Sequence, residues 1–171
     1  MSELKTITGR LHFLGASTYD QQVRTYQAVE ITTSGGRVDL GTTMIPMEAD
    51  RAMEIGNEVS LLVIEGIGPQ KGKHVVLAVY DKGQDRTFFN AEMARPKDAF
   101  KKQAVMVSWF SVIGIPLGLA MLVAPGLLVA YYLYVAWDAY NAMPENDVIK
   151  ARIVELPKQF GQAGGGGVES A

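Results

Sequence analysis

Apolar and polar residues alternate along the first ninety residues of the chain, and this pattern predicts a β-rich domain. In residues 6–14, Ile7, Gly9, Leu11 and Phe13 alternate with polar neighbours, which places one face of a strand in a core and the other in water. The same period marks strands at residues 23–33 and 38–44. Residues 58–65, with Val59, Leu61 and Val63 directed inward, and residues 74–80 are predicted as further strands, and residues 86–89 as a short last one. Glycine-rich segments at 34–37 and 66–73 predict hairpin turns.

A short helical pattern interrupts the strands after Pro46. Met47, Arg51 and Ile55 share one face of about two helical turns, and Gly56 suits the end of that helix. Three strands, a helix and further strands follow the element order of an OB-type barrel. We therefore predict that residues 1–90 form a small OB-like β-barrel of five to six strands plus one short helix. Other small β-barrels and a β-sandwich remain alternatives.

Residues 103–137 form a run of 35 residues without a single charge. Such a run is typical of a membrane-embedded segment, because charged side chains are costly in hydrocarbon. It is long for one upright span of about 20 residues and slightly short for two spans with a polar loop. We favour a transmembrane or re-entrant helical hairpin over residues 104–142 that turns at Pro125 and Gly126. A single span that continues into the far interface is the alternative.

The flanks of this run predict its orientation. Residues 91–103 begin an amphipathic helix whose basic residues precede the run, and the positive-inside rule places that side in the cytoplasm. We expect an inner-membrane protein with a cytoplasmic N-terminal domain and, under the hairpin, a cytoplasmic C-terminus. The predicted membrane-interface anchors are Lys101, Lys102, Trp109, Tyr131, Tyr132, Tyr134, Trp137 and Tyr140.

Two glycines within the run, Gly114 and Gly118, are one helical turn apart and predict close helix packing. They pack the hairpin internally or accommodate a kink at Pro116, and self-association is the alternative. After the run, residues 143–160 predict a short C-terminal helix that ends at Pro157, with a strand as the alternative. Residues 161–171 predict a disordered glycine-rich tail.

Composition narrows the chemistry. The formal net charge is −2 and there is no cysteine, which excludes disulfides and thiol chemistry. His12 and His74 lack metal-ligand spacing, so no catalytic, cofactor-binding or metal-ligating residue is nominated and no enzyme is expected. Nucleic acid is not an expected partner of a mildly acidic domain. A candidate binding face combines basic and aromatic residues on the first strands: Arg10, His12, Arg24 and Tyr26.

These patterns predict a non-enzymatic integral inner-membrane protein whose barrel binds or assembles other proteins, as an accessory or scaffold subunit. Its expected partners are membrane lipids and other membrane proteins or further copies of the chain. The first alternative is a self-associating membrane assembly or channel packed through Gly114 and Gly118. The second is a membrane-tethered domain that binds nucleic acid or a small ligand.

Overall fold

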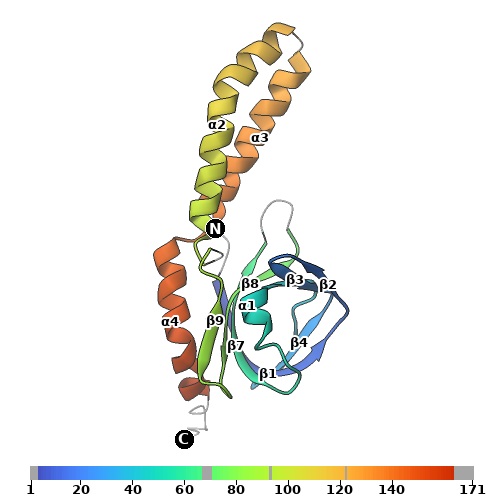
Figure 1. Cartoon of the computed structure of the whole chain (residues 1–171), viewed down its shortest axis with the longest axis vertical. Helices are drawn as coiled ribbons and strands as arrows, with labels where there is room; N and C mark the ends of the chain where they lie inside the picture. Colours follow the sequence, from blue (N-terminus) through green and yellow to red (C-terminus); the bar gives the residue numbers. More distant parts are fainter. Residues whose placement is uncertain (1–3, 67–70, 93, 122, 164–171) are drawn as a thin grey trace, which may run out of the picture.

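The structure, a computed structural model, describes residues 4–66, 71–92, 94–121 and 123–163, without the side chains of residues 99, 113–121, 123–125 and 161–163. A curled sheet carries a projecting helical hairpin (Figure 1). The strands are β1 Leu4–Leu14, β2 Ser17–Asp20, β3 Val23–Tyr26, β4 Val29–Thr33, β5 Gly36–Asp39, β6 Thr43–Pro46, β7 Glu58–Glu65, β8 His74–Asp81 and β9 Arg86–Phe89. The helices of the described residues are α1 Met47–Asp50, α2 Pro96–Met121, α3 Val123–Ala142 and α4 Asn146–Ala163.

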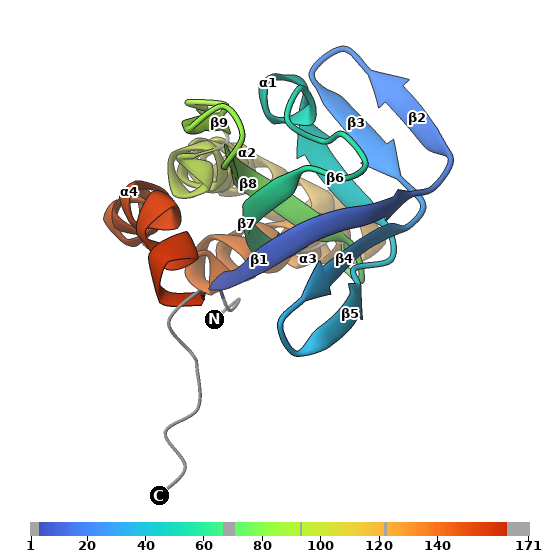
Figure 2. The same cartoon turned by 90° about the horizontal axis from the view of Figure 1, so that it is seen from below.

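The nine strands form one mixed sheet in the order β2-β3-β6-β8-β7-β1-β4-β5, with β9 paired to β8. Neighbours are antiparallel except β6 and β8, which are parallel from Thr43 opposite His74. The order ends at β2 and β5, which lie apart in Figure 2. The prediction of a closed OB-like barrel of five to six strands is therefore wrong, because the described strands form an open sheet.

Two of the predicted strands divide between different parts of this sheet. Residues 23–33 form β3, which pairs with β2 and β6, and β4, which pairs with β1 and β5. Residues 38–44 likewise end β5 and begin β6, with Gly41 between them at a φ of +57°. A side chain at this φ is strained, so glycine permits the chain to leave β5, which pairs with β4, and to enter β6, which pairs with β8.

Strand β1 joins the two halves of the sheet. Its first part, from Leu4 to Arg10, pairs with β7, and its second part, from Arg10 to Leu14, pairs with β4. Gly9 lies where β4 approaches most closely: a Cβ there would stand 2.4 Å from the carbonyl oxygen of Thr32. Glycine is needed at this position because of that contact, not because of its turn propensity.

The first hydrophobic core fills the concave side of the sheet beneath α1. It buries side chains of β1, β4, β6 and β7 together with Ala49, Ala52 and Met53 of α1 and the turn after it. Leu11, Ile31 and Leu61 are at most 1% exposed in this core. Each such side chain stabilises the fold by about 1.5–3 kcal/mol relative to an exposed one.

A second core covers the opposite face of β7 and β8. Leu62 and Ile64 of β7 and Leu77 of β8 pack there against Ile149, Ile153 and Leu156 of α4, whose spacing of four and three places them on one helix face. The segment 143–160 is therefore helical, and the alternative strand is wrong. The predicted end at Pro157 is wrong as well, because α4 continues through it to Ala163.

The helical hairpin consists of α2 and α3 side by side (Figure 1). The predicted turn at Pro125 and Gly126 is wrong, because α3 begins at Val123 and both residues lie in its first helical turn. Proline fits there because the first amide groups of a helix have no intrahelical acceptor. The predicted tail at 161–171 lies outside the described residues from 164 onwards.

Across the described residues, none of the helices combines the length and the apolar character that crossing a membrane requires. The uncharged run of 35 residues is shared between α2, which also contains Lys97, Asp98, Lys101 and Lys102, and α3. The length of such a run along the chain is therefore not the length of one helix. The predictions of an integral inner-membrane protein, an inner-membrane location and a membrane assembly or channel are wrong.

We expect Ile149→Ala to lower the free energy of unfolding by about 2–5 kcal/mol, because it leaves a cavity between α4 and the sheet. The matched control is Val148→Ala on the same turn, since Val148 is 48% exposed whereas Ile149 is fully buried. Urea unfolding followed by circular dichroism measures the free energy of unfolding of both variants. Equal small losses would contradict the packing of α4 on β7 and β8.

Candidate interaction surface

The α2–α3 hairpin exposes a large amount of apolar surface. Figure 1 shows both helices extending beyond the sheet, so that only their base lies beside the rest of the chain. Eleven large apolar side chains of the hairpin are between 39% and 73% exposed. They are Val105, Met106, Trp109, Phe110, Val112, Leu127, Leu128, Tyr131, Tyr132, Tyr134 and Trp137. We call this set the hairpin surface.

A shallow groove of about 220 Å³ crosses the hairpin surface. It is lined by Val105, Ser108, Trp109 and Val112 of α2 and by Trp137 of α3. The Trp137 Nε1–H donates to Ser108 Oγ at 3.1 Å, and Ser108 Oγ–H donates to the carbonyl of Ala104 at 2.7 Å. The groove is therefore apolar at its walls, and the indole N–H of Trp137 is already hydrogen-bonded within the hairpin.

The base of the hairpin is fixed by polar contacts. Lys97 of α2 forms an ion pair with Glu145, and its ammonium lies 5.2 Å from the centre of the Tyr140 ring. Tyr140 meets Trp137 edge to face at 5.5 Å. Asn146 donates to Asp98 Oδ1 at 2.9 Å. These contacts hold α3 and the start of α4 against α2 and set the orientation of the Trp137 ring, so part of the surface is preorganised.

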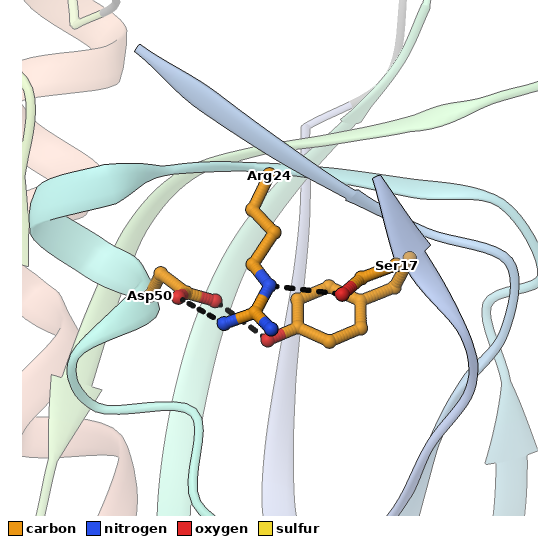
Figure 3. A network of polar contacts seen from close by, with 4 residues as sticks. Ser17, Arg24 and Asp50 are labelled. Carbon is orange, nitrogen blue, oxygen red and sulfur yellow. Dashed lines mark hydrogen bonds and ion pairs between the residues drawn. The ribbon is translucent and has the colours of Figure 1, made fainter. Parts of the chain in front are cut away.

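A second polar cluster lies on the sheet and involves two residues of the predicted binding face. The Tyr26 hydroxyl donates to Asp50 Oδ1 at 2.7 Å, and Arg24 Nη1 donates to Asp50 Oδ2 at 3.1 Å (Figure 3). Arg24 Nε also donates to Ser17 Oγ at 3.0 Å. The cluster connects α1 to β2 and β3. Burial, and then the hydrogen bond to Asp50, raise the pKa of Tyr26 to about 12.

The predicted binding face is not one continuous surface. Arg24 and Tyr26 are together on β3, but β6, β8 and β7 separate that strand from β1, which carries Arg10 and His12. Tyr26 is only 5% exposed, and Arg10 Nε donates to the carbonyl of Gly56 at 2.9 Å. The contribution of Asp50 was not predicted, because no local pattern connects it to a residue 24 positions earlier.

The other nominated residues fall on the hairpin. Lys101 and Lys102 are exposed on α2, and Trp109 and the predicted aromatic anchors of α3 belong to the hairpin surface, except Tyr140, which packs at the base. Gly114 and Gly118 lie in α2, and their packing is outside the described side chains. Within the described residues, no group of three His, Asp or Glu side chains is arranged to hold a metal ion.

The chain has no match among protein-family models, curated proteins or solved structures. What it does must therefore be argued from its own surfaces. Most of the exposed large apolar side chains in the described part of the chain belong to the hairpin surface.

The Tyr26 cluster predicts a loss of stability at high pH. Because the folded-state pKa of about 12 exceeds the ordinary value of 10.0, folding is favoured by the protonated phenol. This stability is complete below pH 10 and is lost as the pH rises toward 12. The free energy of unfolding should fall between pH 9 and pH 11, and this fall should be about 1 kcal/mol smaller in Tyr26→Phe than in the unmodified chain. Urea unfolding at the two pH values measures the difference. Tyr19→Phe is the control, since Tyr19 is 66% exposed. If the free energy of unfolding falls as much in Tyr26→Phe as in the unmodified chain, Tyr26 is not the group responsible for the loss of stability.

Proposed function

We propose that this chain is a non-catalytic assembly protein that binds further copies of itself through the hairpin surface. The observation that supports the proposal is the set of eleven exposed apolar side chains on two packed helices. Monomeric proteins rarely expose contiguous apolar patches above a few hundred Å². Two hairpins that pack face to face would bury part of this surface in a four-helix bundle.

The size of the surface fits a stable interface. Six of the eleven side chains are aromatic. With about 150–250 Å² for each complete aromatic residue, their exposed parts amount to roughly 700 Å². A standard interface buries about 800 Å² on each partner. Aromatic side chains are also the residues that most often dominate binding energy, and Trp109 is the most exposed of them.

The charge pattern supports a second copy as the partner. The described hairpin residues 103–112 and 126–137 carry no charge, so two like surfaces meet without repulsion. Tyrosine hydroxyls both donate and accept hydrogen bonds, which allows Tyr131, Tyr132 and Tyr134 to pair with the same residues of another copy. At the base, Lys101 and Lys102 on α2 and Asp138 on α3 are exposed. If α2 of one copy lies beside α3 of the next, these opposite charges meet.

We expect the full chain to sediment as a dimer or larger homo-oligomer at micromolar concentration. Trp109→Asp should weaken association by about thirtyfold or more, because it buries an unpaired charge at a hot spot. Tyr19→Asp is the matched control, since Tyr19 is a similarly exposed aromatic residue on β2. Sedimentation equilibrium measures association. Both tryptophans of the chain, Trp109 and Trp137, lie in the groove, so their emission should shift to the blue as the copies associate.

Three results would overturn the proposal. The first is a monomer at every concentration tested. The second is equal weakening by Trp109→Asp and Tyr19→Asp, which would place the interface elsewhere. The third is flotation of a monomeric chain with phospholipid vesicles that is lost in Trp109→Asp, which would assign the hairpin surface to lipid and not to a second copy.

A further inference from the structure

The hairpin surface lies on two sides of the hairpin, as the helical period of α2 shows. Each step of one residue turns a side chain by about 100° round the helix. Ser111 is buried and Ser108 accepts the hydrogen bond from Trp137, so this side of α2 faces α3. Val112 follows Ser111 by one residue, and Phe110 precedes it by one. Their side chains therefore point to opposite sides of the hairpin.

Helix α3 divides in the same way. Ala136 is buried and Leu133, three residues earlier, is half-buried, so this side of α3 faces α2. Trp137 follows Ala136 by one residue, whereas Tyr132 precedes Leu133 by one. Their rings therefore lie on opposite sides of the hairpin. Leu128 is four residues before Tyr132 and shares its side.

We call these two sides the groove face and the rear face. The groove joins Val112 of α2 to Trp137 of α3, so the residues that follow the buried positions share one side. The groove face consists of Val105, Trp109, Val112 and Trp137. The rear face consists of side chains between 55% and 71% exposed, namely Met106, Phe110, Leu128 and Tyr132. A second copy that covers the groove face therefore leaves the rear face exposed.

We propose that the rear face is a second contact, through which two dimers of this chain join into a tetramer. This inference rests on the proposed self-association. Trp109 lines the groove and is also 73% exposed, so two groove faces related by a two-fold axis each receive the Trp109 ring of the other. The groove faces are then occupied, and the rear face is left to meet another rear face. Its residues carry no charge, so two rear faces meet without repulsion.

The two contacts differ in strength. Tryptophan is among the residues that most often dominate binding energy, and both tryptophans of the chain belong to the groove face. The aromatic residues of the rear face are Phe110 and Tyr132, whose exposed parts amount to roughly 250 Å². This area is well below the 800 Å² or so that each partner of a standard interface buries. We therefore expect dimers to form first and tetramers only at higher concentration.

The test is sedimentation equilibrium of the full chain from micromolar to millimolar concentration. The unmodified chain should pass from dimer to tetramer as the concentration rises. Phe110→Asp should weaken this second step by about tenfold or more, because it places a charge in the rear contact, and should leave the dimer constant within about twofold. Leu128→Asp, on the other helix of the rear face, should have the same effect. Val154→Asp on α4 is the matched control, since Val154 is 67% exposed and Phe110 is 71% exposed.

Substitution of the groove face gives the complementary result. Trp109→Asp should remove the strong contact and leave only the weak rear contact, and Trp109→Asp combined with Phe110→Asp should be a monomer. An unmodified chain that remains monomeric would overturn the proposed function and this inference together. If the unmodified chain associates, three results would overturn the rear contact alone: no species beyond the dimer, equal effects of Phe110→Asp and Val154→Asp, or a monomeric Phe110→Asp variant. Circular dichroism checks that each variant is folded.

Discussion

Strands β7 and β8 are covered on both faces, and the second cover comes from α4 at the far end of the described chain. Val59, Leu61 and Val63 point into the concave core, whereas Leu62 and Ile64 meet α4. Ala94, before α2, and Met143, after α3, are buried in this same second core. The two ends of the hairpin are therefore fixed by the packing that covers the sheet. The ion pair of Lys97 with Glu145 adds to this connection but is not its main source.

The side chains that stabilise the fold are different from those that we propose bind a second copy of the chain. The two cores use buried aliphatic side chains, while the hairpin surface consists of side chains that the fold leaves exposed. Trp137 links the two parts, because its ring is held by Ser108 and Tyr140 and still lines the groove. A surface held in place before binding loses less conformational entropy when a partner covers it, which supports the proposed role of the hairpin in assembly.

The sequence predicted individual strands well and their pairing poorly. The apolar runs in residues 58–65 and 74–80 correctly marked β7 and β8. It could not indicate that β6 crosses to β8, because a parallel pair joins segments some thirty residues apart and leaves no local pattern. Arg24, Tyr26 and Asp50 illustrate the same limit in the polar cluster. The uncharged run misled for another reason: it is divided between α2, which ends at Met121, and α3, which begins at Val123, and composition along the chain does not mark those ends.

The physical basis of recognition on the hairpin surface follows from its composition. The described residues 103–112 and 126–137 are uncharged, so selectivity there must come from shape and from tyrosine and tryptophan groups that pair with their own kind. This chemistry suits a second copy of the same chain.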